Sequence, residues 1–249
     1  PDQGRWQNDP YSMKALGDLI YCLGVNRFIF HRYAHQPWMG VLPGMTMGPW
    51  GFHFERTNTW WDQGAAWLKY LARCQYLLQQ GLFVADVCYY YGEHVPNFAP
   101  LKQSDPARVL PGYNYDVATE EVVLNRMEVR DGQIVLPDGM SYRLLVLPNR
   151  TNISLPVLRK IEQLVRAGAT VLGPKPHRAT GLEDDPHCDA EVRAIAEQLW
   201  GACDGESVSE HAFGRGRVIW GRAARDVLAA DGVPPDAEFL VEVDGQPQP

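Results

Sequence analysis

Residues 142–172 read YRLLVLPNRTNISLPVLRKIEQLVRAGATVL, and this stretch decides the fold class. Short apolar runs at 142–147 and 169–172 predict two buried strands, and the segment between them has the apolar spacing of one helix face. Ser154 lies where this helix should begin, and Gly168 lies where it should end. The apolar helix positions are Leu158, Ile161, Leu164 and Val165. A strand, one helix and a further strand favour a parallel sheet, so the stretch predicts an α/β fold.

The same alternation continues over roughly residues 82–231. The predicted strands are 83–91, 142–147, 169–172 and 217–220, and the predicted helices are 116–126 with Asp116 as N-cap, 154–168, 189–200 and one that ends near Gly232. Asp131-Gly132 lies between two short apolar runs and predicts the two-residue turn of a β-hairpin. Strands separated by single helices predict a parallel sheet in a three-layer domain.

The first 81 residues carry a looser form of this rhythm. Asp9-Pro10 predicts a helix at 10–22, because aspartate is a favoured N-cap and proline a favoured first residue. The following elements are predicted as a buried strand at 26–33, a long loop at 34–59 and a helix at 62–80 that is closed by Gly81. A complete (β/α)8 barrel needs about 250 residues, so we expect residues 1–81 to supply only its last one or two βα units. Residues 239–243 predict the first strand of a further module over 232–249.

Composition excludes several classes of protein. The chain has 249 residues, of which 45% are apolar and 21% charged, as in ordinary globular domains. Its net charge of −7 argues against nucleic-acid binding, and no apolar run approaches the roughly 18 residues of a membrane span. Five scattered cysteines do not form a disulfide framework. The first ten residues do not form a signal peptide, and we expect the chain to be part of a longer protein.

The block at residues 26–61, NRFIFHRYAHQPWMGVLPGMTMGPWGFHFERTNTWW, mixes four tryptophans with histidines, arginines, amides and one carboxylate. Such a mixture fits poorly in a plain core, because each buried polar group would need its own partner. It fits a carbohydrate site, where aromatic faces stack on a sugar ring and polar side chains bind the hydroxyls. The alternative is an aromatic-rich loop that simply packs.

The blocks LGVNRFIFHRYAHQPW, PGMTMGPWGFHFERTNTWW and AWLKYLARCQYLLQQG resemble the α-L-rhamnosidases of glycoside hydrolase family 106. LPDGMSYRLLVLP and LPVLRKIEQLVRAGATVLGPKP continue the resemblance, which covers essentially the whole chain in order. It implies that residues 1–81 are the C-terminal end of a catalytic (β/α)8 barrel. It also implies that residues 82–231 form an α/β domain like the class I glutamine amidotransferase fold, and that 232–249 begin a β module.

The resemblance implies a hydrolase that removes terminal α-L-rhamnose from an oligosaccharide or polysaccharide by an inverting mechanism, with a calcium ion (Ca2+) as cofactor. It implies a periplasmic or secreted parent protein, and a homo-oligomer that assembles through the α/β domain. Neither nucleic acid nor a membrane is an expected partner. Two alternatives stay open. One is a non-catalytic carbohydrate-binding or assembly fragment, and the other is a family 42-like β-galactosidase, in which an amidotransferase-like domain also follows the barrel.

Two clusters of polar and aromatic residues are the candidate substrate contacts. The first lies at and just beyond the predicted strand end and consists of His31, Arg32, His35, Gln36 and Trp38. The second consists of His53, Arg56, Asn58 and Trp60. In the alternative interpretation Arg56 ties the loop down, Asn58 or Thr59 caps the following helix, and Trp61 packs beneath it.

Glu55 is the acidic residue of this block and the candidate catalytic residue. Inverting glycosidases use two carboxyl groups about 6.5–9.5 Å apart, so we expect one or both catalytic carboxylates upstream in the parent protein and little activity in the isolated chain. Alternatively, Glu55 binds calcium or forms an ion pair with Arg56 or Arg32.

Residues 82–231 carry no candidate active site of their own. An amidotransferase needs a cysteine nucleophile on a strand-to-helix turn, but Cys88 lies in mid-strand and no cysteine follows the strands at 142–147 or 169–172. Glu93 and His94 follow a strand at the sheet edge where ligands often bind, but a structural role is favoured for them. We therefore expect this domain to be a scaffold or an assembly surface.

Overall fold

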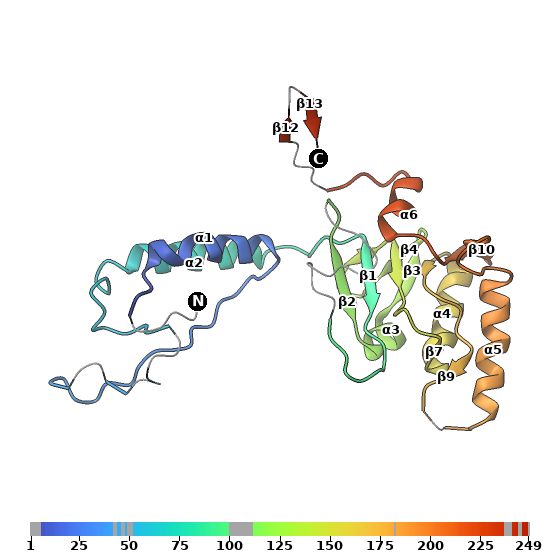
Figure 1. The fold of residues 1–249 in the computed structure, drawn as a ribbon, viewed down its shortest axis with the longest axis horizontal. Coiled ribbons are helices and arrows are strands. Elements are labelled where there is room, and N and C mark those ends of the chain that lie inside the picture. The colour runs from blue at the N-terminus through green and yellow to red at the C-terminus, as the bar shows by residue number, and fades with distance from the viewer. Residues whose placement is uncertain are drawn as a thin grey trace. The chain divides into compact units, whose positions relative to one another are not determined.

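The computed structural model describes residues 6–41, 44–45, 48, 52–99, 112–181, 183–236, 241–243 and 246–248. The chain divides into two compact units, Pro1–Gly81 and Leu82–Pro249 (Figure 1).

The second unit contains a six-stranded sheet with the order β10-β11-β8-β6-β1-β2. Its strands are β10 (Glu210–Phe213), β11 (Gly216–Ile219), β8 (Thr170–Leu172), β6 (Leu144–Val146), β1 (Val87–Tyr90) and β2 (Tyr115–Ala118). Every neighbouring pair is parallel except β10 and β11, which are antiparallel. The prediction of an α/β fold built on a parallel sheet is therefore confirmed.

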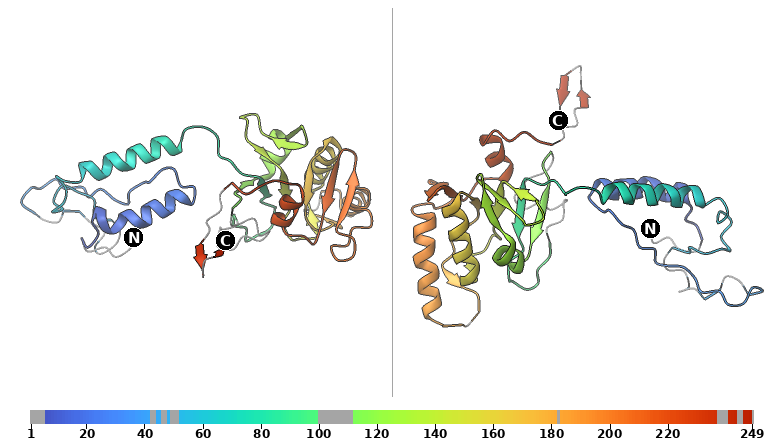
Figure 2. Two further views of the ribbon diagram at one scale, coloured as in Figure 1. Left: turned by 90° about the horizontal axis from the view of Figure 1, so that it is seen from above. Right: turned by 180° about the vertical axis from the view of Figure 1, so that it is seen from behind.

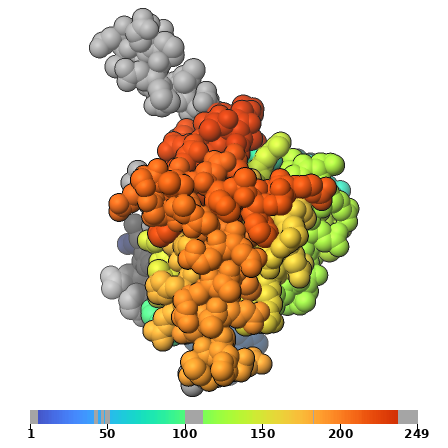
Figure 3. All heavy atoms as spheres, turned by 90° about the vertical axis from the view of Figure 1, so that its right-hand side faces the viewer, coloured from blue at the N-terminus to red at the C-terminus, as the bar shows by residue number. Residues whose placement is uncertain are grey.

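Helices cover both faces of this sheet. The helices are α3 (Glu120–Arg126), α4 (Leu155–Ala167), α5 (His187–Trp200) and α6 (Ala224–Ala230). Alternate strand residues point to opposite faces, so Leu145 packs in a buried cluster with α3, α4 and α5, whereas its neighbour Leu144 packs in another with α6. Figure 3 shows one side of the unit, with α5 in orange beside α4 in yellow.

The ends of α4 follow the signals in the sequence. The Ser154 side chain accepts a hydrogen bond from the Val157 N–H, and proline lies in the first turn. Gly168, with φ at 125°, follows the last helical residue, in a conformation that favours glycine. Five side chains of α4 are buried against the sheet, namely Val157, Leu158, Ile161, Leu164 and Val165.

Three smaller sheets are present in the described part of the chain. A three-stranded antiparallel sheet contains β3 (Glu128–Arg130), β4 (Gln133–Val135) and β5 (Ser141–Tyr142), and two-stranded sheets pair β7 (Asn152–Ile153) with β9 (Arg178–Ala179) and β12 (Val241–Val243) with β13 (Gln246–Gln248). Asp131 and Gly132, with φ of 52° and 76°, form the turn between β3 and β4. Positive φ at both positions defines a type I′ turn, so the hairpin prediction is confirmed.

Asp116 does not cap a helix, and that prediction is wrong. It lies in β2, opposite Cys88 of β1, and its carboxylate accepts a hydrogen bond from the Tyr142 hydroxyl at 2.8 Å. The helix begins four residues later, at Glu120, after Thr119. The pairing of residues 115–118 with β1 is a long-range interaction, and it outweighs the local preference of aspartate for a helix start.

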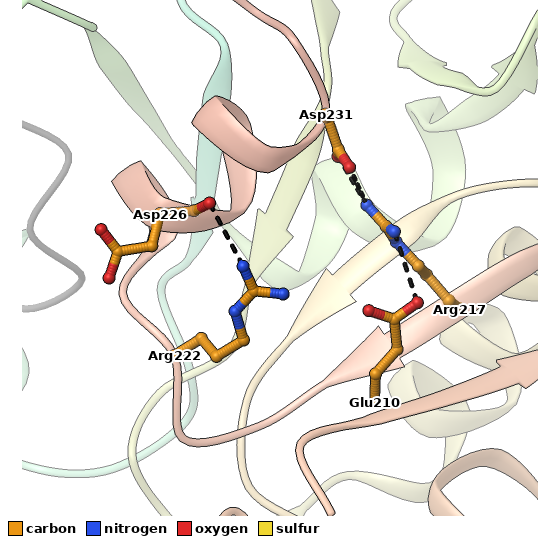
Figure 4. Close-up of polar contacts among 5 residues, drawn as sticks. All are labelled: Glu210, Arg217, Arg222, Asp226 and Asp231. Atoms are coloured by element: carbon orange, nitrogen blue, oxygen red, sulfur yellow. Dashed lines mark hydrogen bonds and ion pairs between the residues drawn. The ribbon is translucent and has the colours of Figure 1, made fainter.

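An arginine on β11 joins the antiparallel edge of the sheet to the end of α6 (Figure 4). Arg217 donates to Glu210 on β10 at 3.3 Å and to both oxygens of Asp231 at 2.5 Å. Burial opposes its charge, but the hydrogen bonds and charges of these carboxylates outweigh burial and raise the pKa of Arg217. The ion pair between Arg217 and Asp231 therefore holds the C-terminal end of α6 against β11.

In the described part of the first unit two helices lie side by side, α1 (Pro10–Cys22) and α2 (Ala65–Leu78) (Figure 2). Asp9 and Ser12 form a capping box at the start of α1, as the sequence predicts for this helix. Asp18 on α1 accepts hydrogen bonds at 2.5 Å from both Lys14 and Tyr70, the latter on α2. The hydrogen bond from Lys14 and that from Tyr70 lower the pKa of Asp18.

The strand predicted at 26–33 is wrong. Residues 26–32 do not form a strand, and Ile29 is 89% exposed. In the described residues, parallel β pairing of this segment is limited to one bridge between Tyr33 and Phe54. Backbone hydrogen bonds flank the bridge, such as Phe52 N–H to His31 O at 2.8 Å. A strand needs hydrogen-bonded neighbours on its edges, and the described residues of this unit supply only that short partner. The helix predicted to begin at residue 62 begins at Ala65.

No helix in the described ranges is both long enough and apolar enough to cross a membrane.

We expect residues 82–236 expressed alone to unfold in a single cooperative transition. They contain the whole six-stranded sheet, and two contacts bind the segment after α6 to the rest: Tyr113 hydroxyl to Val233 O at 2.7 Å, and Asp236 N–H to Gly112 O at 2.8 Å. Circular dichroism and tryptophan fluorescence should give the same midpoint in a urea titration. Different midpoints for the two probes would contradict this prediction.

Candidate functional site

Glu55 lies in a tight turn formed by residues 53–58, which we call the Glu55 turn. Its side chain is only 1% exposed. The Thr57 N–H donates to Glu55 Oε2 at 2.7 Å, and the Thr57 hydroxyl donates to Glu55 Oε1. The backbone of the turn is closed by Asn58 N–H to Glu55 O at 3.1 Å and by the Asn58 side-chain amide to His53 O. Both carboxylate oxygens are therefore held by one residue of the same turn.

The described residues provide no ion-pair partner for Glu55. The guanidinium of Arg32 donates to the Met45 carbonyl at 3.0 Å, and that of Arg56 donates to the Gln36 carbonyl at 3.0 Å. The alternative in which Glu55 forms an ion pair with either arginine is therefore wrong. A buried carboxyl group that is held by hydroxyl and amide donors, with no cation among the described residues, is a candidate for a role in a functional site.

His53, two residues before Glu55 in the chain, is buried, with 5% exposure. Its Nε2 lies 2.9 Å from Gly48 O, and its ring lies 4.0 Å from the Trp6 ring, centroid to centroid. The other ring nitrogen, Nδ1, is buried and has no hydrogen-bond partner among the described residues. A buried nitrogen without a partner is costly, so this atom is suited to a bound polar group.

The first predicted cluster lies beside the Glu55 turn. The backbone around Tyr33 runs parallel to residues 52–54, and His35 O accepts a hydrogen bond from Met45 N–H at 3.0 Å. Arg32 Nε and Gln36 Oε1 are buried without a partner in the described part of the chain, whereas the side chains of His31 and His35 are exposed. Arg32 Nε and Gln36 Oε1 are thus two further polar atoms that are available to a ligand. Both lie close in sequence to residues that contact the Glu55 turn.

Arg56 and Trp38 differ in how firmly they are held. Arg56 donates to Gln36 O at 3.0 Å and contacts the Met39 sulfur at 2.6 Å, so it ties the two loops together. Trp38 is 66% exposed. The interpretation of Arg56 as a loop tie is consistent with these contacts, and the exposed indole remains available to a ligand.

Trp60 belongs to an aromatic cluster under the Glu55 turn. It stacks on Phe52 with 5.8 Å between ring centroids and 10° between ring planes, and its indole N–H donates to Asn8 O at 3.2 Å. The cluster also contains Phe30, Phe54, Trp61 and Trp67. Neither Asn58 nor Thr59 caps α2, because Gly64 is its N-cap. Asn58 instead closes the Glu55 turn.

A cavity of about 310 Å³ lies on the helix side of the first unit. Its walls come mainly from apolar residues of α1, from α2 and from residues 28–31. Of the candidate substrate contacts only His31 lines it, so this cavity is distinct from the Glu55 turn.

The described residues do not fit a calcium ion by themselves. No group of three histidine, cysteine, aspartate or glutamate side chains among them could hold a metal. Calcium in proteins takes six to eight oxygen ligands, and the carboxylate oxygens of Glu55 already accept hydrogen bonds from Thr57.

The carboxyl edge of the parallel sheet in the second unit is filled by its own side chains. Glu93 accepts hydrogen bonds from the Tyr90 and Thr180 hydroxyls and from Ser154 N–H. The cavity there is only about 20 Å³. Burial raises the pKa of the Cys88 thiol well above its ordinary value, so Cys88 is unsuited to act as a nucleophile. The contacts of Glu93 are those of a structural residue.

Comparison with known proteins agrees with the resemblance in the sequence. The family model of glycoside hydrolase family 106, described as alpha-L-rhamnosidase, matches residues 2–246. The chain belongs to this family. The solved structure of a rhamnosidase from Novosphingobium sp. PP1Y matches this family 106 chain with a TM-score of 0.83 and 29% identity, over 98% of this chain and 23% of that one.

A second relative of this family 106 chain carries a different description. A protein of Formosa agariphila described as "Putative beta-glucuronidase" is 43% identical over 198 residues, which is 80% of this chain and 17% of that protein. The chain thus spans about a fifth of the length of either relative.

Proposed function

We propose that this chain is part of a glycoside hydrolase that removes terminal α-L-rhamnose, and that residues 31–60 form one wall of its sugar site. The observation that carries the proposal is the Glu55 carboxylate, which is 1% exposed and held by Thr57, with no cation paired to it in the described part of the chain. Family membership and the likeness to a rhamnosidase structure support the reaction class. The unit Pro1–Gly81 would be the end of a catalytic barrel, completed by the rest of the parent protein.

In this proposal Glu55 is the base of the inverting reaction. Oε2 accepts a hydrogen bond from the Thr57 N–H at 2.7 Å and Oε1 accepts one from the Thr57 hydroxyl, which leaves each carboxylate oxygen a further lone pair that can accept from water. The carboxylate therefore accepts a proton from water while the water oxygen bonds to the anomeric carbon. The bond from that carbon to the leaving oxygen breaks, and a second carboxylic acid outside this chain protonates the leaving oxygen.

The neighbouring residues would bind the sugar hydroxyls. His53 Nδ1, Arg32 Nε and Gln36 Oε1 are buried and free of partners in the described ranges. The exposed Trp38 would stack on the ring, while His31 and His35 would contact its edge. In this proposal Arg56, Asn58 and Trp60 shape the site through the contacts that they make within the loops.

The remaining parts of the proposal concern the second unit and the cofactor. Residues 82–231 would be an amidotransferase-like scaffold that also serves homo-oligomerisation, and 232–249 would begin a β module. Calcium would need ligands from elsewhere in the parent protein. A periplasmic or secreted location and a glycan substrate belong to the same proposal.

A second candidate substrate is a β-glucuronide. It is favoured by the relative from Formosa agariphila, whose description names that activity. In that case Arg32, whose buried Nε has no hydrogen-bond partner among the described residues, would be a candidate to bind the uronate carboxylate.

The two candidates are separated by assaying the full-length parent protein. We expect turnover of p-nitrophenyl α-L-rhamnoside at a kcat/KM at least about tenfold above that of the β-D-glucuronide, a difference of roughly 1.4 kcal/mol in transition-state binding. Proton NMR of the first-formed sugar should show inversion at the anomeric carbon. Preference for the glucuronide would transfer the proposal to the second substrate, and turnover of neither would contradict both.

A further inference from the structure

We infer that Thr57 is a positioning residue for Glu55, an inference that rests on the function proposed above. Two donors of one residue, its N–H and its hydroxyl, hold the two oxygens of one buried carboxylate. The candidate residues selected from the sequence did not include Thr57, because its role follows from the conformation of the turn.

The geometry leaves Glu55 little freedom. The backbone of the Glu55 turn is closed by Asn58 N–H to Glu55 O at 3.1 Å and by the Asn58 amide to His53 O. With its side chain also held at both oxygens, rotation of the carboxylate would break a hydrogen bond to a charged group in a buried place. A base must meet its water in a fixed geometry, so restricting this rotation favours catalysis.

The N–H and the hydroxyl of Thr57 can be tested separately by substitution. The N–H persists in any variant except proline, whereas the hydroxyl is removed by valine, which has nearly the same shape. Thr57→Val would therefore free Oε1 while Oε2 keeps its partner at 2.7 Å. The carboxylate would then turn about its remaining hydrogen bond, and substrate binding would be little affected.

In the full-length enzyme acting on p-nitrophenyl α-L-rhamnoside, or on the β-D-glucuronide if that proves to be the substrate, we expect Thr57→Val to lower kcat about ten- to hundredfold. KM should stay within about twofold, and Thr57→Ser should restore kcat because it keeps the hydroxyl. The matched control is Thr59→Val, the same change at an exposed threonine of the same loop, and it should leave kcat unchanged.

If Thr57 had only a structural role, Thr57→Val would lower the melting temperature and the fraction of active enzyme. Thermal melts and active-enzyme titration would detect these losses. In a Glu55→Gln background, Thr57→Val should add no further loss, since the two residues act as one unit. A kcat for Thr57→Val within about twofold of the unaltered enzyme, or losses that add in the double variant, would overturn the inference. Full activity of Glu55→Gln would instead overturn the proposed function.

Discussion

Replacing Glu55 by glutamine in the full-length enzyme should lower kcat/KM by about a hundred- to ten-thousandfold, the range typical of a lost general base. The amide keeps an oxygen that can accept from the Thr57 N–H at the position where Glu55 Oε2 lies, 2.7 Å away. The fold of the Glu55 turn should therefore persist, but the amide cannot take a proton from water. Steady-state kinetics on the preferred aryl glycoside would measure the loss.

The matched control is Glu93→Gln, a glutamate of the second unit that also accepts hydrogen bonds from hydroxyl groups. It should leave kcat/KM within about twofold and act, if at all, on stability. If Glu55→Gln retained more than about a tenth of the activity, Glu55 would not be the base.

The second large effect is expected in the core. Trp200 is fully buried at the end of α5, and its indole N–H donates to Gly173 O at 3.0 Å. Trp200→Ala removes the ring and leaves that carbonyl without its partner, which should lower the free energy of unfolding by about 3–5 kcal/mol. This is a large part of the roughly 5–15 kcal/mol that stabilises a typical domain.

Urea titration of residues 82–236 would measure this loss. Trp200→Phe is the control, because it keeps an aromatic ring in the core and removes the N–H group, so its loss should be clearly smaller. Equal losses for the two variants would show that the hydrogen bond, and not the ring, accounts for the effect.

The second unit could largely be predicted from its sequence because its signals are local. Ser154 and Gly168 marked the ends of α4, and Asp131-Gly132 marked a hairpin turn. The failures lie where pairing is long-range. Asp116 looks like a helix cap but pairs with β1, and the antiparallel edge strand at Glu210–Phe213 has only a weak apolar pattern and was missed.

The first unit was harder to predict because a strand is defined by its neighbours. Residues 26–33 have the composition of a buried strand, yet the described chain provides only the single bridge from Tyr33 to Phe54. The composition of the candidate site, in contrast, identified Glu55 as its acidic residue, and the structure places that carboxylate in a buried turn. The threonine that holds it could not be found by residue type, because threonine is common in loops.

The strand order of the central sheet also has a consequence for synthesis of the protein. β1 is the first strand to be made, but one of its edges pairs with β6, where Val87 lies opposite Leu144. That edge has no native neighbour until residue 144 has left the ribosome. Similarly, the edge of β8 at Thr170 has no native neighbour until Arg217 of β11 has been synthesised. During these intervals apolar strands with open edges are the segments most exposed to aggregation, so a chaperone that acts on the nascent chain should protect β1 first.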